Sequence, residues 1–402
     1  MWSGRSTAHW TLTRWCRYIA LQHAELAVDM VVEDDGPAIL NSYRLIFLAD
    51  SHVTDTASSA LVAWVSAGGT LVATAGAGCF NEFNATNTKL TALLGIVTCD
   101  GMYEPSSSKV QYEKQELIHA TVLDTVSFAI HNDTTIVNTS TCEIAGAGSS
   151  NDTFDCGNVT YGCDSSCIFE SYDCSRNVTN NNTETASCAC TSCNYTNAPV
   201  NFSTEIFGMR HIFKPALTSD VIATFNPSKA VGASQPSPPA AAIFTRTGSG
   251  QSIYMAFLPG LSYFKPAMPL RPTDRGGMDY SYTHFIPSNF SNAIMKLIHN
   301  VSRLAQVIKP VMCSTPRVHG KPVVSSKGVV VPLVNWAGGD NETYDNITNL
   351  TVTLNITGVV KQGMKVSLAS GGAVEQLPSS GTGGAEMSFV LNLSVADALI
   401  LR

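Results

Sequence analysis

Along residues 10–76 the apolar positions alternate between helical spacing and short continuous runs typical of strands. Residues 10–27 carry Trp15, Ile19, Leu21 and Leu26 at helical spacing, which predicts an amphipathic helix with these side chains near one face. A short β-branched run at 27–35 follows, and the apolar run 45–48 predicts an interior parallel strand covered on both faces. Thr54 or Asp55 caps a predicted helix over residues 57–69, and residues 70–76 form the next apolar strand.

This strand, helix, strand order predicts a right-handed crossover on a parallel sheet. Ligand crevices in open sheets of this kind lie at the carboxyl ends of the strands, which are here residues 50–52 and 76–82. Residues 89–94 predict a second helix, and residues 110–130 lack a helical period and predict antiparallel additions to the sheet.

After residue 200 the pattern predicts more strands, a hairpin over 242–259 with the turn Gly-Ser-Gly, and a closing helix over 288–307. The last part has five β-type runs separated by turn residues, which predicts a small antiparallel β-sandwich. We therefore expect an α/β sheet domain at 1–140 and 200–310, an inserted module at 141–199, and a C-terminal sandwich at 318–402.

The inserted module is rich in cysteine, glycine, asparagine and threonine and poor in aliphatic residues. Most of the twelve cysteines of the chain fall in it: Cys142, Cys156, Cys163, Cys167, Cys174, Cys188, Cys190 and Cys193. A dense, even set predicts disulfides, whose pairing the sequence leaves open among about 105 arrangements. Zinc binding is the alternative, because the intervals 163–167 and 190–193 have ligand-like spacing.

Only 14% of the 402 residues are charged, well below the roughly 25% of a typical soluble domain. Acceptor triplets for N-linked sugar are dense, which predicts that glycans keep the protein in solution, although a chain rich in Asn, Ser and Thr also produces such triplets by chance. The acceptors are Asn84, Asn132, Asn138, Asn151, Asn158, Asn177, Asn181, Asn194, Asn201, Asn289, Asn300, Asn341, Asn346, Asn349, Asn355 and Asn392. Sugars and disulfides together predict an extracellular location or the lumen of the secretory pathway.

The formal net charge of −7 and the absence of a basic cluster argue against a nucleic-acid partner. No apolar run reaches the roughly 18 residues of a membrane span. The first residues also lack the apolar region of a signal peptide, so a secreted protein would need its N-terminus upstream of Met1.

Several segments resemble the trimerisation domain of bacterial β-galactosidases, a class I glutamine amidotransferase-like module with a flavodoxin-like fold. The resemblance covers about residues 17–101 and 205–402 and is carried by YRLIFLAD, VSAGGTLVAT, LLGIV and GSGQSIYMAFLPG. The C-terminal VVVPLVNWAGG and NLTVTLNITG resemble the sandwich that follows such domains in glycoside hydrolases. The resemblance implies a homo-oligomer, a first strand upstream of Met1, and a catalytic barrel absent from these residues.

Three residues are weak catalytic candidates: Cys79, His52 and Glu82. Amidotransferases hold a nucleophilic cysteine on a tight elbow between small residues, whereas Phe80 and Asn81 follow Cys79. Pairing with Cys99, or simple burial, is the alternative for Cys79. His52 at a strand end is a candidate base without an identifiable third group, and Glu82 and Asp100 do not define a glycosidase pair. The sequence indicates no metal or cofactor.

Aromatic side chains that can stack on sugar rings are Trp64, Tyr263, Phe264, Tyr280, Tyr282 and Trp336. Trp64 lies at core spacing in its helix and is predicted to be buried. The leading hypothesis is a non-catalytic accessory or oligomerisation region of a β-galactosidase-like glycoprotein. The alternatives are a free-standing extracellular protein that binds glycans or proteins and, more remotely, a cysteine-dependent amidohydrolase.

Overall fold

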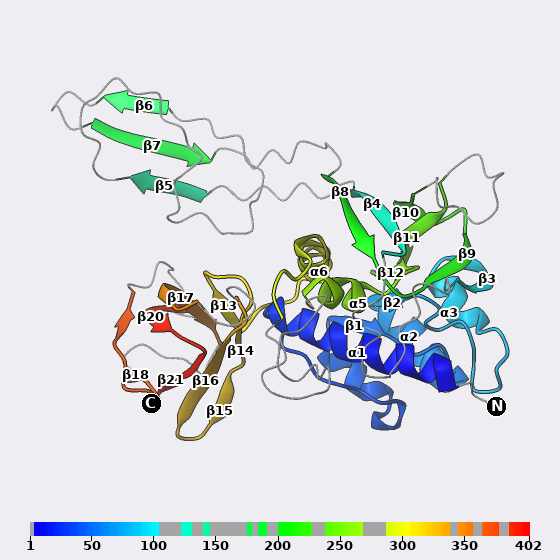
Figure 1. Cartoon of the computed structure of the whole chain (residues 1–402), viewed down its shortest axis with the longest axis horizontal. Helices are drawn as coiled ribbons and strands as arrows, with labels where there is room; N and C mark the ends of the chain where they lie inside the picture. The colour runs from blue at the N-terminus through cyan, green and yellow to red at the C-terminus, as the bar shows by residue number, and fades with distance from the viewer. Residues whose placement is uncertain are drawn as a thin grey trace, which may run out of the picture. The chain divides into compact units, whose positions relative to one another are not determined.

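The computed structural model describes residues 4–103, 122–130, 140–144, 175–178, 184–190, 200–226, 238–267, 287–337, 345–356, 364–377 and 386–402. The chain forms two compact units, Met1–Phe128 with Phe202–Arg402, and Ala129–Asn201. The first unit holds an α/β region and a β-sandwich, and the second is the inserted module (Figure 1).

A seven-stranded mixed sheet forms the centre of the α/β region. In spatial order its strands are β1 (Leu45–Leu48), β2 (Thr70–Thr74), β12 (Gly250–Met255), β11 (Ala240–Thr247), β10 (Asp220–Phe225), β4 (Asp124–Ile130) and β8 (Val200–Ile206). β2 pairs in parallel with β1 and with β12, whereas β12, β11, β10 and β4 pair in antiparallel order. The α/β class is confirmed, but the wholly parallel sheet of a flavodoxin-like fold is not observed in the described strands.

The helices around the sheet form two groups, and the contacts described here are within each group (Figure 1). α1 (Gly4–His23) contacts α5 (Pro259–Phe264) and α6 (Asn292–Leu304), while α2 (Asp55–Ser66) contacts α3 (Thr88–Leu93) and η2 (Pro37–Ser42). Short 3₁₀ turns are η1 (Glu33–Asp35) and η6 (Lys265–Ala267). β2 is fully buried and lies between two parallel neighbours, β1 and β12.

The local signals that predicted α2 act as expected. The Thr54 hydroxyl accepts a hydrogen bond from Ala57 N–H and caps the helix. Trp64 is buried, and its ring lies so close to Gly69 that a Cβ there would come within 2.4 Å of it. The glycine therefore lets the chain turn from α2 into β2 against the indole.

Two expectations at the start of the chain are wrong in detail. Trp15 is 69% exposed, because Cys16 and Ala20 lie on the buried face of α1 instead. β1 is half-buried along its length rather than covered, because β2 is its only partner in the sheet among the described residues.

A two-stranded ribbon stands beside the sheet. β3 (Ile96–Tyr103) pairs in antiparallel order with β9 (Arg210–Pro215). This ribbon brings Cys99 and His211 to the carboxyl end of β2, through the hydrogen bonds given below.

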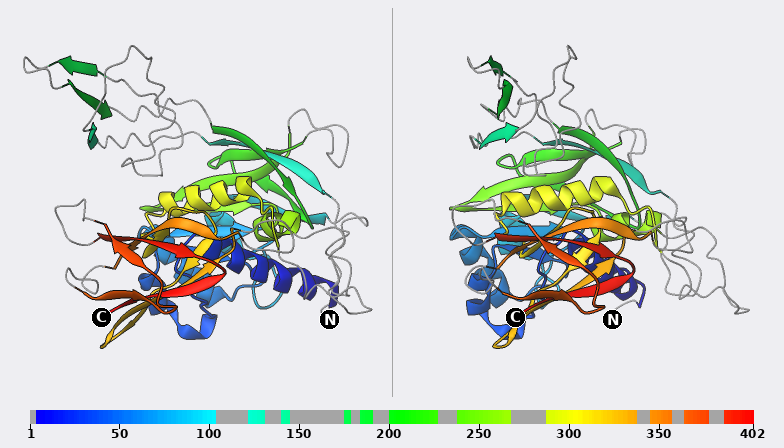
Figure 2. Two further views of the ribbon diagram at one scale, coloured as in Figure 1. Left: turned by 60° about the vertical axis from the view of Figure 1, so that its left-hand side comes forward. Right: turned by 90° about the vertical axis from the view of Figure 1, so that its left-hand side faces the viewer.

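The sandwich comprises two antiparallel sheets, which lie as two layers in Figure 2. One contains β13 (Val311–Cys313), β17 (Ile347–Asn355), β20 (Glu386–Leu393) and β19 (Val374–Gln376). The other contains β14 (Val318–Gly320), β15 (Val323–Ser325), β16 (Gly328–Asn335), β21 (Ala396–Leu401) and β18 (Val366–Leu368). Fully buried aliphatic side chains and Phe389 fill the space between them. β13 pairs with β17, so the sandwich begins before the predicted residue 318.

The second unit contains an antiparallel sheet of β5 (Ser140–Ile144), β7 (Glu184–Cys190) and β6 (Ser175–Val178). Cys142 lies opposite Cys188 in the register of β5 and β7. The cysteine side chains of this unit lie outside the described residues, and the predicted disulfides there stay a prediction.

Candidate functional site

The carboxyl ends of β1 and β2 are the place where a ligand crevice was expected. The two chain segments stay hydrogen-bonded beyond the strands: Gly78 N–H donates to Asp50 O at 2.9 Å and Phe80 N–H to Ser51 O at 3.0 Å. Val53 N–H then donates to Phe80 O at 2.9 Å. Backbone bonds therefore close the space between these two segments.

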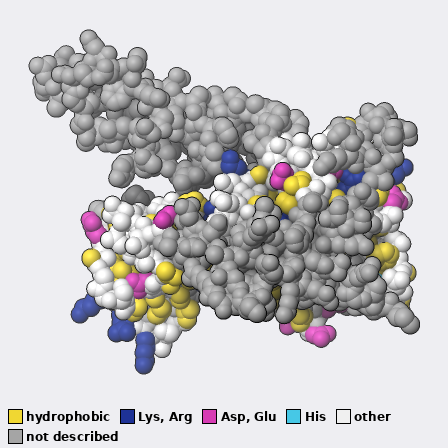
Figure 3. Space-filling model, in the orientation of Figure 1, with side chains coloured by type: hydrophobic (Ala, Val, Ile, Leu, Met, Phe, Trp, Pro, Cys, Tyr) yellow, Lys and Arg dark blue, Asp and Glu magenta, His cyan; other side chains and the backbone are white. Residues whose placement is uncertain are grey.

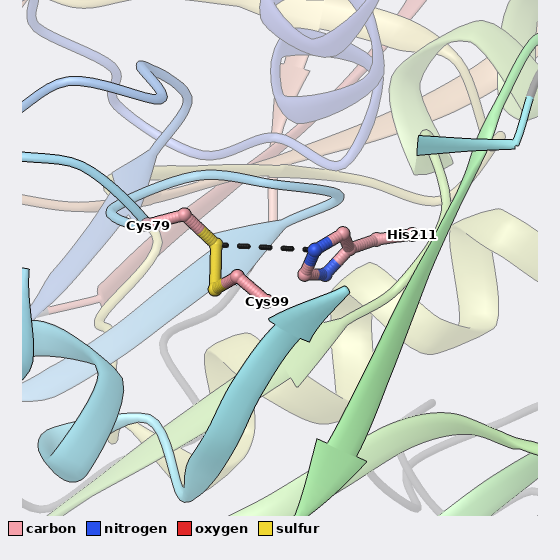
Figure 4. Close-up of side chains that lie close together, drawn as sticks. All are labelled: Cys79, Cys99 and His211. Atoms are coloured by element: carbon pink, nitrogen blue, oxygen red, sulfur yellow. Dashed lines mark hydrogen bonds between the residues drawn. A yellow bond between two sulfur atoms is a disulfide. The ribbon is translucent and has the colours of Figure 1, made fainter. Parts of the chain in front are cut away.

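Cys79 lies in this closed edge and is 1% exposed. Its sulfur forms a disulfide with Cys99 on β3, with 6.3 Å between the two Cα atoms (Figure 4). A disulfide sulfur is not a thiolate and cannot act as the nucleophile of an amidotransferase. In this oxidised state Cys79 therefore has the structural role that was the alternative to catalysis.

His211 on β9 and Tyr254 on β12 complete a polar cluster that the sequence did not reveal. Gly76 N–H donates to the Tyr254 hydroxyl at 2.8 Å, and that hydroxyl is hydrogen-bonded to His211 Nδ1. Burial raises the pKa of Tyr254, so the hydroxyl stays protonated and donates a hydrogen bond to Nδ1. The ring proton then belongs to Nε2, which lies 4.0 Å from the sulfur of Cys79 (Figure 4).

Burial also keeps the imidazole neutral. It lowers the pKa of His211 to about 4, although the charge of Asp100 acts in the opposite direction. The arrangement ties β2, β3, β9 and β12 together through one disulfide and three hydrogen-bonding groups. The sequence offered little signal for this cluster, because β9 reads Arg-His-Ile-Phe-Lys-Pro and its polar residues resemble those of an exposed strand.

The ligand atoms of Cys79, Cys99 and His211 all lie within 4.8 Å of one another. A soft metal ion such as Zn²⁺ binds thiolates and neutral imidazole. These three groups could offer such ligands only after reduction of the disulfide, so the oxidised cluster does not suit a metal.

The other two catalytic candidates do not converge on Cys79. His52 bonds to Ser51 Oγ at 2.9 Å and to Asn84 Oδ1 at 3.0 Å, and its ring stacks on Phe80. Glu82 accepts a hydrogen bond at 2.9 Å from Asp55 N–H, at the start of α2. The structure thus uses His52 and Glu82 to hold loops in place.

Helix α1 covers the same end of the sheet. Arg14 forms an exposed ion pair with Asp50, and the buried Arg17 donates to Thr74 Oγ1 at 2.5 Å. Burial lowers the pKa of Arg17 to about 10, opposed by the nearby charge of Asp50. A narrow apolar cavity beside Arg17 is lined by Phe47, Met255 and residues of α1, α5 and α6.

A second polar pair is buried near the other side of the sheet. Arg210 Nη1 donates to Asp124 Oδ2 at 2.7 Å, and both side chains are no more than 5% exposed. The guanidinium also lies 5.1 Å from the ring centre of Phe225. Because its charge is paired and enclosed, this Arg is structural.

The aromatic candidates lie mainly at the junction of the α/β region and the sandwich. His23, Tyr263, Phe290 and Trp336 form one cluster, in which His23 Nδ1 lies 2.8 Å from the Tyr263 hydroxyl. Tyr263 is fully buried, so it offers no platform for a sugar ring. Tyr280 and Tyr282 lie outside the described residues.

The acceptor asparagines of the described part are mostly accessible. Asn84, Asn289, Asn346, Asn349 and Asn392 are exposed, whereas Asn300 and Asn355 are half-buried. The other predicted acceptors lie where no side chain is described.

No family model matches the chain, and no curated protein matches it. Among solved structures the chain is similar to the β-galactosidase from Bacillus circulans sp. alkalophilus, with 12% identity and a TM-score of 0.48 over 98% of this chain and 38% of that one. The β-galactosidase from Rahnella sp. R3 has 13% identity and a TM-score of 0.47, over 97% of this chain and 36% of that one. The α-L-fucosidase isoenzyme 2 from Paenibacillus thiaminolyticus has 12% identity and a TM-score of 0.46, over 100% of this chain and 46% of that one. The chain therefore spans less than half the length of each of these proteins.

The described residues do not bring a nucleophile, a base and an orienting group together. The polar and potentially reactive side chains at this edge of the sheet instead form a disulfide, hydrogen bonds to the backbone and an ion pair with α1. This arrangement can brace the carboxyl end of the sheet, and it offers no reacting group there.

Proposed function

We propose that the chain is a non-catalytic accessory or oligomerisation region of a secreted, β-galactosidase-like carbohydrate-active glycoprotein. The observation that carries this proposal is the disulfide of Cys79 with Cys99 at the end of β2. It uses up the one cysteine that an amidotransferase-like fold would need for catalysis.

The secreted placement is supported by two further properties. A disulfide is stable in oxidising compartments and rare in the cytosol. On the face in Figure 3 charged side chains are scattered among hydrophobic and other side chains, and only 14% of the residues in the sequence are charged. Attached sugars at the exposed acceptor asparagines would supply the missing polar surface.

The β-galactosidase part of the proposal is supported by the sequence resemblance of residues 17–101 and 205–402. In this proposal the catalytic carboxylates belong to a barrel encoded upstream, and the present chain contributes packing and assembly. None of the described helices combines the length and the apolar character of a membrane span.

The transcript that encodes the chain tests this directly. Its 5′ extension is expected to encode a signal peptide and a barrel with two acidic residues at strand ends. An in-frame stop codon immediately before the codon of Met1 would contradict the accessory role.

The purified chain provides a second test. It should hydrolyse no aryl β-galactoside, and light scattering should give the mass of a homo-oligomer. Turnover that survives removal of contaminating enzymes, or a strictly monomeric mass at high concentration, would contradict the proposal.

A further inference from the structure

The loop of residues 80–86 stands at the carboxyl end of β1 and β2 and is held in one conformation. Phe80 and Thr86 form an antiparallel bridge across its base, and Asn81 N–H donates to Ala85 O at 2.8 Å. Asn81 Oδ1 accepts hydrogen bonds from the N–H groups of Phe83 and Ala85. This network presents Asn84 at the tip in a left-handed conformation, with φ of 59°, which asparagine tolerates well.

The side-chain amide of Asn84 is also oriented. Its Oδ1 lies 3.0 Å from His52 Nε2, and His52 Nδ1 lies 2.9 Å from Ser51 Oγ. If the Ser51 hydroxyl donates to Nδ1, the ring proton lies on Nε2 and is donated to Asn84. The amide oxygen is thereby engaged, while no hydrogen bond joins the Nδ2 of this exposed residue to any side chain or backbone group of the described ranges.

Phe83 precedes Asn84 and is 79% exposed. The exposed ring of Phe83 is therefore available for contact with a group attached next to it in the sequence. The flat C–H face of a pyranose ring is a natural cover for a phenyl ring, and a sugar on Nδ2 of the neighbouring residue would stay within reach of it.

We propose that Asn84 carries an N-linked glycan whose first N-acetylglucosamine lies on the ring of Phe83 and covers the carboxyl end of β1 and β2. This inference rests on the proposed secretory placement. The sequence Asn84-Ala85-Thr86 supplies the acceptor triplet.

The donor is an oligosaccharide linked through pyrophosphate to a lipid. A bond forms between Nδ2 and the anomeric carbon of the sugar, the bond from that carbon to the pyrophosphate oxygen breaks, and the lipid pyrophosphate leaves. The amide nitrogen loses one proton to solvent. The amide oxygen takes no part in the new bond, so its contact with His52 is preserved.

A glycan at this position explains two observations together. It gives the exposed phenyl ring a partner, and it covers the edge where an open α/β sheet would bind a ligand. The edge is then blocked from outside by sugar and from inside by the disulfide.

Occupancy is tested on the full chain secreted from a eukaryotic cell, by mass spectrometry of glycopeptides before and after enzymatic removal of N-glycans. The wild-type peptide should carry a glycan at Asn84. Asn84→Gln and Thr86→Ala should each lower the mass of the protein by one glycan, while Phe83→Ala, which keeps the triplet, should retain it.

The outcomes separate this inference from the proposed function. Glycans at Asn349 or Asn392 together with a bare Asn84 would overturn the inference alone. Bare asparagines at every acceptor would overturn both this inference and the secretory placement.

The stacking is tested by a double-mutant cycle of thermal midpoints. With the glycan present, Phe83→Ala should lower the midpoint by about 1 to 2 °C, and in the Asn84→Gln background the same change should have no effect. An equal shift in both backgrounds would contradict the contact between sugar and ring.

Discussion

Arg210 and His211 are adjacent on β9, and both depend on burial for their roles. A buried charge is stable only when it is paired and hydrogen-bonded, which Asp124 provides for Arg210. The neutral His211 instead accepts a hydrogen bond from the Tyr254 hydroxyl and points its N–H toward the disulfide. Two neighbouring polar residues thus serve separate parts of the sheet.

Removing the carboxylate that pairs with Arg210 should destabilise the folded chain. Asp124→Asn keeps the shape of the side chain but leaves the guanidinium without a counter-charge, so we expect the free energy of unfolding to fall by about 3 to 5 kcal/mol. Urea denaturation at pH 7 measures this change. Asp220→Asn, at an exposed position of β10, is the matched control, and an equal loss in both variants would contradict the assigned pairing.

The neutral state of His211 predicts a dependence of stability on pH. Its pKa of about 4 in the folded chain lies below the roughly 6.5 of an unfolded chain, so the unfolded state binds more protons at acid pH. The stabilisation is present above about pH 6.5 and is lost as the pH falls toward 4, by roughly 3 kcal/mol for this group.

His211→Asn tests this pH effect, because the amide oxygen can still accept a hydrogen bond from the Tyr254 hydroxyl but does not titrate. The difference in unfolding free energy between pH 7 and pH 4 should be smaller in this variant than in the wild type. His23 and His299 also have pKa values lowered by burial, so part of the acid sensitivity should remain. An unchanged difference would contradict the role of His211.

At the scale of elements, the disulfide joins the turn after β2 to the ribbon of β3 and β9. The ribbon is also joined to the sheet through β9, where His211 N–H donates to Ala256 O at 2.8 Å and Arg210 pairs with Asp124. The two cysteines are separated by 20 residues in the sequence, and this separation sets the length of the loop that the disulfide closes.

Loss of this bond should therefore be measurable. Closing a loop of this size stabilises a protein by about 3 kcal/mol in the chain-entropy description. The double variant Cys79→Ala, Cys99→Ala should lose about that amount in urea denaturation. Cys313→Ala serves as the control because Cys313 forms no disulfide, and a double variant as stable as the wild type would contradict a structural role for the bond.

At the scale of the molecule, the α/β region and the sandwich meet through specific contacts. The Glu25 carboxylate, after α1, bonds to Lys309 Nζ at 3.1 Å and accepts from Cys313 N–H at 2.7 Å. His23 lies in contact with Trp336 of the sandwich, at 5.2 Å between ring centres. Lysine, backbone and aromatic contacts together make the two regions one compact unit.

This junction predicts that the two regions unfold together. Calorimetry of the wild type should give one transition for them, whereas Trp336→Ala should separate a lower transition of the sandwich by several degrees. Val395→Ala, at an exposed position of the sandwich, should leave a single transition. A single transition in the Trp336 variant would show that the aromatic cluster does not couple the regions.

The sequence by itself determined the order of elements and much of the sandwich. Helix caps, glycines and apolar periods are local signals, so α2, β2, the hairpin of β11 and β12, and α6 were predicted close to their observed ranges. The strand, helix, strand order also directed attention to the carboxyl ends of β1 and β2.

Only the tertiary structure decided what happens at that edge. Cys79 and Cys99 were candidates for pairing, but His211 is 132 residues from Cys79 and Tyr254 is 43 residues further on. Likewise the exposure of Trp15 and of β1 depends on which neighbours pack against them. Such contacts join residues far apart in the chain, and no local pattern of polar and apolar positions records them.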